Sequence, residues 1–265
     1  MFNYIEVRTE SSALDLTYHL APWDEPIFGG NTAVIASIHV RMEGEAAQTF
    51  EVFRDWCLQN RTKLVSCRLP QEQLVECGFL EKQGFRFIEL NYRPILTGLG
   101  GFSQDAEISV SSALPKDAEE ISRFAAQIFT TGRLHVDPLV GPEIGNRRYG
   151  VWAANAFHHP DQRVLKCQMG NRIVAFMVVE QPTPNSRFWS LVGLAPGLAG
   201  KGLGQRVWKA VLAFHHSEGV DEVSTSISSH NAAALNLYAG LGFRFPDPTI
   251  TLHWCPFGSM RSPAS

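Results

Sequence analysis

The 265-residue sequence has no apolar run that approaches the roughly 18 residues of a membrane-spanning helix. Its first residues, MFNYIEVRTESS, have neither the basic start nor the apolar stretch of a secretory signal peptide. Both absences predict a cytoplasmic protein without a membrane partner.

An excess of one sign of charge is also missing. The chain has 23 basic and 26 acidic residues, a formal net charge of -3, and no long run of either sign. Proteins that bind nucleic acid concentrate Lys and Arg on one surface. We therefore expect no nucleic-acid partner and infer a small-molecule one, with homodimer formation left open.

Patterns that bind metals or form disulfide frameworks are not apparent. The five cysteines include no C-x-x-C pair, which argues against both a disulfide framework and a zinc ribbon. The two adjacent histidine pairs, His158-His159 and His215-His216, point in different directions on any regular element, and we interpret them as solvated surface. The expectation is five reduced cysteines and no metal.

A glycine-rich stretch, TGLGGFSQ at residues 97–104, separates two patterned regions and predicts a domain boundary. The predicted domains are residues 1–98 and 105–255, with a disordered tail at 256–265. In the first domain, a strand at 33–40 and a helix at 49–58 indicate a small α/β unit.

The second domain alternates strand and helix patterns. Ile121, Phe124, Ala125 and Ile128 have helical spacing, and two apolar strands flank Gly170 and Asn171 as in a β-hairpin. Further strands are expected at 188–194, 221–227 and 243–254, and further helices around 149–156, at 205–216 and at 231–241. This order predicts an α/β fold with a mixed sheet flanked by helices.

One segment occurs in a similar form in both halves. LEKQGFRFIEL at residues 80–90 and YAGLGFRFPDP at 238–248 share a helix end, Gly-Phe-Arg-Phe and a strand start. Either the first domain is a partial copy of the second, or glycine ends a helix in both places for local reasons.

Three glycines lie close together between a predicted strand and a predicted helix, in the run Gly200, Lys201, Gly202, Leu203 and Gly204. The backbone N–H groups at a helix start have no partners within the helix, so such a turn can bind a diphosphate. Neither G-x-x-x-x-G-K-[ST] nor G-x-G-x-x-G is present. A glycine-rich surface turn is the alternative.

About thirty residues downstream stands N-x-x-A-L-x-x-Y-x-x-x-G-F, from Asn231 to Phe243. The succession VGLAPGLAGKGLGQRVW and NAAALNLYAGLGF resembles the acetyl-CoA signature of the GNAT acetyltransferases, over the whole second domain. The resemblance implies a GNAT-like fold and acetyl-CoA as co-substrate. It also implies backbone contacts to pantetheine and pyrophosphate from Val192, Leu194, Gly200, Lys201, Gly202, Leu203, Gly204 and the Asn231 segment. The usual Gln or Arg at the loop start is Ala199.

Tyr238 is the expected donor of a proton to the departing thiolate. It lies seven residues after Asn231 on a predicted helix, hence on the same face, and a phenol can supply a proton to sulfur. The GNAT resemblance indicates the same residue. The alternative is a tyrosine that packs into the core.

Glu89 is the expected base. Strand alternation would place Phe85, Phe87 and Glu89 on one face, so that a carboxylate points where apolar residues point. The first domain also resembles GNAT enzymes that acetylate nucleotide-linked amino sugars, and this resemblance implies a glutamate on this strand that acts through water. A solvated glutamate at a strand end is the alternative, and Glu180 is the second candidate for the base.

Short patches elsewhere resemble GNAT enzymes that acetylate nucleotide-linked amino sugars: WDEPIFGGNTAVIASI, LEKQGFRFIEL, FTTGRLHVDPLVGP and YGVWAANAF. This resemblance implies such a sugar as acceptor. The acceptor contacts are then expected from Arg133, His135, Asp137, Tyr149 and Asn155. Each of these residues also fits an ordinary loop or helix surface.

No Cys or Ser stands in a recognisable nucleophile motif, so we expect the amine to attack acetyl-CoA directly. Two alternatives stay open. The acceptor could be an amino acid, a polyamine or a protein amine, and the chain could be a CoA-binding module without catalysis.

Overall fold

The computed structural model describes residues 4–260, which form two compact units. Unit 1 contains residues up to 91 together with 133–144 and the residues from 247 onward, and unit 2 contains 92–132 and 145–246. The units therefore do not coincide with the continuous domains 1–98 and 105–255, because two later segments group with the first part of the chain.

Unit 1 is built on one sheet with the strand order β1-β2-β3-β4-β13-β5. The β3 and β4 strands are parallel, and the other neighbours are antiparallel. The strands are β1 (Val7–Glu10), β2 (Leu14–Leu20), β3 (Thr32–Val40), β4 (Leu64–Pro70), β5 (Arg86–Tyr92) and β13 (Thr249–Trp254). The helices are η1 (Pro22–Asp24), α1 (Glu25–Phe28), α2 (Glu43–Gln59), α3 (Leu74–Lys82) and α5 (Arg133–Val136).

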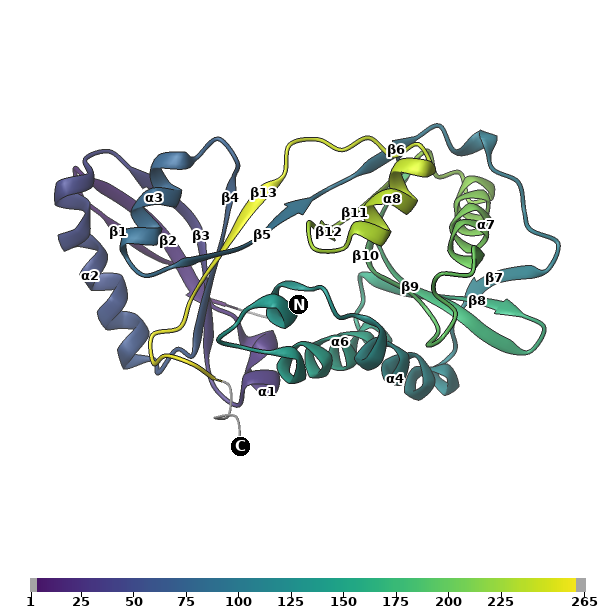
Figure 1. The fold of residues 1–265 in the computed structure, drawn as a ribbon, viewed down its shortest axis with the longest axis horizontal. Coiled ribbons are helices and arrows are strands. Elements are labelled where there is room, and N and C mark those ends of the chain that lie inside the picture. Colours follow the sequence, from purple (N-terminus) through teal and green to yellow (C-terminus); the bar gives the residue numbers. More distant parts are fainter. Residues whose placement is uncertain (1–3, 261–265) are drawn as a thin grey trace. The chain divides into compact units, whose positions relative to one another are not determined.

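Helices α2 and α3 cover one face of this sheet (Figure 1). Helix α2 buries Ala46, Phe50, Phe53 and Cys57, whose spacing of three or four residues places them on one side. The rings of Phe50 and Phe79 meet edge to face at 5.5 Å between α2 and α3. The predicted helix at 49–58 and strand at 33–40 are confirmed, each with a longer extent.

The C-terminal strand β13 lies between β4 and β5 in the sheet of unit 1 (Figure 1). A strand over the whole of 243–254 was expected, and this is wrong for its first half. Pro246 and Pro248 have no N–H to donate to a ladder, so before Thr249 only an isolated bridge between Arg244 and Ile95 forms.

Unit 2 has the strand order β6-β11-β10-β9-β8-β7, in which only β10 and β11 are parallel. The strands are β6 (Ile95–Thr97), β7 (Ile108–Ser112), β8 (Gln162–Met169), β9 (Arg172–Thr183), β10 (Ser186–Leu194) and β11 (Glu222–Thr225), and β12 (Ile227–Ser228) follows β11. The helices are η2 (Leu99–Gly101), η3 (Pro115–Asp117), α4 (Ala118–Ile128), α6 (Pro142–Ala156), α7 (Leu203–Ser217) and α8 (Ala232–Gly240). The predicted mixed sheet flanked by helices is confirmed.

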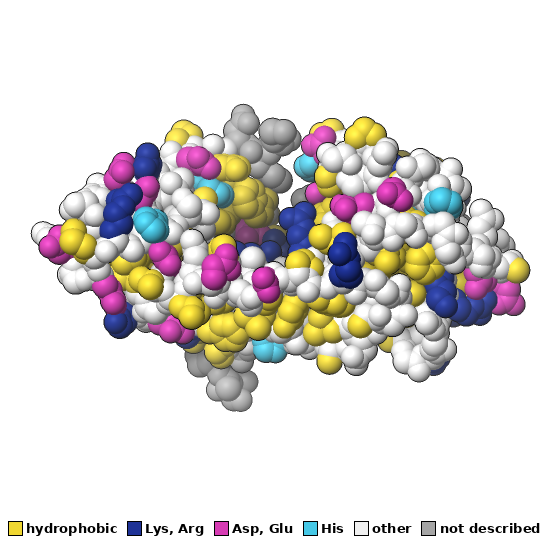
Figure 2. All heavy atoms as spheres, turned by 90° about the horizontal axis from the view of Figure 1, so that it is seen from above, with side chains coloured by type: hydrophobic (Ala, Val, Ile, Leu, Met, Phe, Trp, Pro, Cys, Tyr) yellow, Lys and Arg dark blue, Asp and Glu magenta, His cyan; other side chains and the backbone are white. Residues whose placement is uncertain are grey.

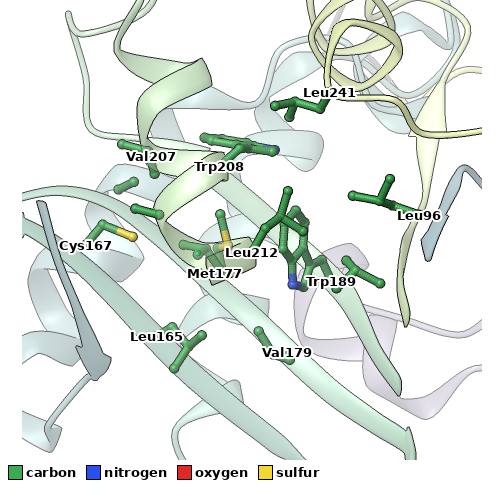
Figure 3. Close-up of a cluster of buried hydrophobic side chains, with 14 of the residues drawn as sticks. Leu96, Leu165, Cys167, Met177, Val179, Trp189, Val207, Trp208, Leu212 and Leu241 are labelled. Carbon is green, nitrogen blue, oxygen red and sulfur yellow. The ribbon is translucent and has the colours of Figure 1, made fainter. Parts of the chain in front are cut away.

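Two apolar cores hold the layers of unit 2 together. Helix α7 packs on one face of the sheet, where Trp208 and Leu212 meet Met177 and Trp189 (Figure 3). Helices α4 and α6 pack on the other face. Ile121 and Ala125 of α4 are fully buried there, as their helical spacing predicted.

Gly84 after α3 and Gly242 after α8 have φ angles of 90° and 88°, and both occur in the repeated Gly-Phe-Arg-Phe segment. Glycine adopts this left-handed backbone without the steric cost of a side chain. The repeat therefore has a local explanation at both helix ends.

The described part of the predicted tail is held to unit 1, because the Met260 N–H donates to the Leu139 carbonyl at 2.8 Å. Residues 261–265 of that tail lie outside the described residues. On the face seen in Figure 2, acidic and basic side chains are scattered among uncharged ones.

Candidate functional site

The strands β10 and β11 of unit 2 separate part of the way along β10. Their parallel pairing ends at Trp189 and Thr225, although β10 continues to Leu194 and stays paired with β9. A bulge in β10 between Trp189 and Leu191 coincides with this point. The Thr225 hydroxyl donates to the Trp189 carbonyl at 2.8 Å, so a side chain closes the ladder where the strands part.

Beyond this point, one edge of β10 presents backbone groups away from β9. The Ala195 N–H donates to the Val174 carbonyl of the β9 side at 2.8 Å. Because backbone groups alternate in direction along a strand, the N–H and C=O of Val192 and Leu194 point to the opposite side, where β11 has ended. Val192 and Leu194 therefore have their backbone groups on the open edge of β10, and their contact with pantetheine stays a prediction.

The loop after β10 leads into the N-terminus of α7. Gly200 and Gly202 have φ angles of 77° and 75°, and Gly202 is the N-cap residue of α7. A Cβ at either glycine would meet no atom within 4 Å, so the chain needs glycine here for its backbone angle and not for space. No side chain of the described part of the chain caps the helix, which leaves its first N–H groups available to an anion.

Two cationic residues near this helix start, Lys201 and Arg206, differ in their contacts. Arg206 binds Asp105 through two hydrogen bonds of 2.8 Å and Glu107 at 2.7 Å. The Arg206 guanidinium lowers the pKa of Asp105 to about 2. Lys201 and Ala199 are exposed. Lys201 is therefore the cation of the glycine loop itself, whereas Arg206 is held by acidic neighbours.

Helix α8 positions Tyr238 inside the core of unit 2. The Asn231 side chain caps the helix by accepting a hydrogen bond from the Ala234 N–H at 3.1 Å. The Tyr238 ring meets Phe243 edge to face at 4.8 Å and lies 6.3 Å from Trp189, the residue at which β10 and β11 separate. Burial raises the pKa of the Tyr238 phenol, so the group stays protonated at neutral pH and can act as a donor.

Glu89 lies in β5 of unit 1, and its side chain is 2% exposed. Oε1 lies 3.6 Å from Nη2 of Arg68, and Oε2 has no hydrogen-bond partner among the residues that the structure describes. The expected shared face of Phe85, Phe87 and Glu89 is wrong. An irregular register pairs Phe87 with Leu252 and Glu89 with Thr251, so the two β5 residues face opposite sides of the sheet. The role of Glu89 as a base stays a prediction.

The second candidate base, Glu180, accepts a hydrogen bond from the Gln162 side chain at 2.9 Å. It is also among the residues around a cavity of about 430 Å³ beside the start of β10. This cavity lies at the end of β10 opposite to Val192 and Leu194.

Two of the predicted acceptor residues belong to a buried charge network in unit 1. Asp137 is fully buried and binds His253 at 2.7 Å and Arg86 at 3.0 Å. Nη1 of Arg133 lies 2.7 Å from Nε2 of His253. His135, from the same segment, is 8% exposed. Sequence reasoning missed His253 and Arg86, because nothing in the local pattern indicates a partner more than fifty residues away.

The remaining predicted acceptor residues lie on α6. The Tyr149 ring stacks on Phe129 at 4.4 Å, and Asn155 is exposed. Contacts of these five residues with an acceptor stay a prediction.

The interpretation of both histidine pairs as solvated surface is wrong for His215. His215 is 1% exposed, and its Nε2 accepts a hydrogen bond from Trp189 Nε1 at 3.0 Å. Burial lowers its pKa to about 4. Among residues 4–260, no group of three or more His, Cys, Asp or Glu side chains could hold a metal ion, and all five cysteines are free thiols. No helix in this part of the chain is long and apolar enough to cross a membrane.

Comparison with known proteins finds a family model and solved structures that are similar to this chain. Residues 134–243 match the model of the Acetyltransferase (GNAT) family. This segment includes β10, the glycine loop, α7 and α8. The fold has GNAT-like counterparts among solved structures, such as a GCN5-related N-acetyltransferase from Sphaerobacter thermophilus with a TM-score of 0.65. That protein is 12% identical, over 96% of this chain and 84% of the other.

Two curated relatives are similar in sequence. Mycothiol acetyltransferase from Frankia casuarinae is 34% identical over 74 residues, which are 28% of this chain. The match spans only 21% of that enzyme. The spore coat polysaccharide biosynthesis protein SpsD from Bacillus subtilis is 17% identical over 229 residues, 86% of this chain and 79% of that protein. The matched family model and the first relative are both described as acetyltransferases.

Proposed function

We propose that the chain transfers an acetyl group from acetyl-CoA to a primary amine, with acetyl-CoA bound to unit 2. The observation that carries this proposal is the separation of β10 from β11 beside an uncapped helix start. The open edge of β10 offers N–H and C=O groups to an extended ligand. The N-terminus of α7 offers N–H groups to a diphosphate on the same ligand.

The residues of this region fit such a ligand. Val192 and Leu194 offer the free N–H and C=O groups of β10 to the amide-containing pantetheine arm. The pyrophosphate would be held by N–H groups of the segment Gly200, Lys201, Gly202, Leu203 and Gly204, with the Lys201 charge nearby. Ala199 provides no polar side chain, so binding relies on the backbone. Asn231 contributes by fixing the start of α8.

Bound acetyl-CoA supplies an activated thioester, and the chain has to manage two protons. As the C–N bond forms, the attacking amine loses a proton, for which we propose Glu89 as acceptor. As the C–S bond breaks, the departing thiolate takes up a proton, for which we propose the Tyr238 phenol. A tyrosine phenol carries its proton at neutral pH, so the proton is on the oxygen when the thiolate appears.

For the acceptor, we propose the amine of a nucleotide-linked amino sugar. The support is the resemblance of the first domain and of the 129–157 region to TDP-fucosamine acetyltransferase, together with the name of SpsD, a spore coat polysaccharide biosynthesis protein. Arg133, His135, Asp137, Tyr149 and Asn155 are the proposed acceptor contacts. The other relative is a mycothiol acetyltransferase, so the test also includes amines other than nucleotide-linked sugars.

The test is a thiol-release assay with acetyl-CoA and a panel of amines: TDP-4-amino-4,6-dideoxyhexoses, amino acids, polyamines and a lysine peptide. Tyr238→Phe keeps the aromatic ring that packs on Phe243 and removes the hydroxyl. We expect kcat to fall by roughly 10²- to 10⁴-fold with an unchanged KM for acetyl-CoA, because a general acid contributes a factor of this size.

Tyr18→Phe is the matched control, since Tyr18 is a buried tyrosine of unit 1 whose hydroxyl lies 3.1 Å from that of Thr9. It should keep full activity. Turnover only on amines other than sugars would refute the acceptor, and full activity of Tyr238→Phe would refute the acid. Acetyl-CoA binding without turnover on any amine would leave a binding module in place of an enzyme.

A further inference from the structure

Unit 1 contains a cavity of about 630 Å³ that has no part in the proposed acetyl transfer. Its volume is within the ~300–1,000 Å³ that is usual for small-molecule sites. The residues around it are Phe28, Leu58, Arg61, Lys63, Ile144, Phe257, Gly258, Ser259 and Met260. Among residues 4–260, the lining thus combines apolar side chains with two cations and includes no carboxylate.

Arg61 has an unusual backbone. Helix α2 ends in a double hydrogen-bond pattern, in which the Thr62 N–H donates to the Cys57 carbonyl at 2.9 Å and the Arg61 N–H to the Leu58 carbonyl at 3.0 Å. In this arrangement the residue at the position of Arg61 adopts a left-handed backbone conformation and is usually glycine. Arg61 has a φ of 50° and is the only non-glycine residue with a positive φ in the described part of the chain. The arginine is therefore kept at a cost in conformational free energy.

The second cation, Lys63, is fixed in place by backbone groups. Its Nζ donates to the carbonyls of Phe28 at 2.7 Å and Gly29 at 2.9 Å. Gly30 allows this, because a Cβ there would lie 2.9 Å from Cε of Lys63. Lys63 thus holds the end of α1 at the cavity wall and adds a positive charge, and no carboxylate lies beside it among the described residues of the lining.

The Arg61 side chain is exposed, and it makes no hydrogen bond or ion pair with any residue from 4 to 260. One alternative role is compensation of the negative end of the α2 dipole. That role would not require a left-handed arginine, because a basic residue in the last turn of α2 would serve it without strain, and that turn has none.

We propose that this cavity is a second ligand site, which binds a small anion with an apolar body. The carboxylate, sulfonate or phosphate of the ligand pairs with Arg61 and Lys63. Its apolar part lies against Leu58, Ile144 and Phe257. Leu58 and Phe257 are 47% and 60% exposed without a ligand, so binding would remove apolar surface from water.

The experiment uses two fluorescent probes that differ in charge, 1-anilinonaphthalene-8-sulfonate and the uncharged N-phenyl-1-naphthylamine. They are titrated into the full chain of wild type, Arg61→Gly and Arg61→Lys. We expect Arg61→Gly to weaken sulfonate binding at one site per chain by about 10- to 100-fold, the range of one charged hydrogen bond. The uncharged probe should bind to all three proteins alike, and Arg61→Lys should retain most of the sulfonate affinity.

Arg61→Gly should not destabilise the folded chain, so weaker probe binding by this variant would not be due to unfolding. Glycine suits the left-handed position better than arginine does, so the Tm of Arg61→Gly should be equal to or higher than that of wild type. Equal sulfonate affinity in wild type and Arg61→Gly would overturn the proposal, as would a wild type that does not bind the sulfonate. Loss of both probes with a lower Tm would show that Arg61 is structural. None of these readouts depends on acetyl transfer.

Discussion

His253 makes the stability of unit 1 dependent on pH in a window that the structure defines. Its ring is fully buried between Asp137 and Arg133, with both contacts at 2.7 Å. A guanidinium can only donate, so Nε2 of His253 accepts and the single ring proton is on Nδ1, toward Asp137. Protonation of Nε2 would place two donors against each other. Burial, together with the Arg133 charge and against the pull of Asp137, lowers the pKa of His253 to about 4.

The sign and size of the effect follow from this pKa. In the unfolded chain, His253 has a pKa of about 6.5, so between the two values the unfolded state binds more protons than the folded state. The stabilisation is complete above about pH 6.5 and is lost as the pH falls toward 4. Between pH 7.5 and 5 the expected loss is about 2 kcal/mol from this residue alone. Asp137, with its pKa lowered from an ordinary carboxyl value, contributes only below this window.

The test compares wild type with His253→Asn, in which the amide nitrogen can still donate to Asp137 but cannot titrate. Urea unfolding at pH 7.5, 6.5, 5.5 and 5, followed by circular dichroism, gives the free energy of unfolding of each protein. The difference in free energy of unfolding between wild type and His253→Asn should shrink by about 2 kcal/mol from pH 7.5 to pH 5. For an exposed-histidine control, His158→Asn, the difference from wild type should not change with pH. Parallel curves for His253→Asn would refute the buried neutral histidine.

Two further predictions concern unit 2. Gly202→Ala places a side chain at a φ of 75° without any clash, so it strains only the backbone of the glycine loop. Isothermal titration should then show several-fold weaker acetyl-CoA binding. Gly170→Ala in the β8–β9 turn, at a φ of 57°, imposes a similar strain elsewhere and should leave that affinity unchanged. Lys166→Met leaves the Asp117 carboxylate without the ammonium group 2.8 Å away, which should lower the free energy of unfolding by about 1–3 kcal/mol. Adding Asp117→Asn should recover part of that loss in the same urea assay.

Sequence periodicity predicted the regular elements well where burial is one-sided. Ile121 and Ala125 are buried as their spacing indicated, and Gly170 forms the expected turn with a φ of 57°. His215 could have been placed correctly by the same reasoning. It follows Leu212 and Val211 by three and four residues on α7, and both of these are fully buried, so its face of the helix was already apolar.

Strand faces were harder to predict, because one additional residue reverses every side chain beyond it. The irregular register of β5 separates Phe87 from Glu89, and the bulge of β10 sends Trp189 and Leu191 into different cores. A period of two carries no signal for such an insertion. The buried pair of Asp137 and His253 needed a second kind of information, namely that residues 116 positions apart come into contact.

These differences explain why the two halves of the proposed chemistry were not equally accessible from sequence. The proposed acetyl-CoA binding uses backbone groups of Val192, Leu194 and the glycine loop, and their availability follows from where a strand ends and a helix begins. Local patterns in the chain specify both points. The proposed proton transfer uses side chains such as Glu89, whose direction is set by register and by partners distant in sequence. A motif can therefore indicate the co-substrate, while the base and the acceptor contacts have to be established by the variants proposed for them.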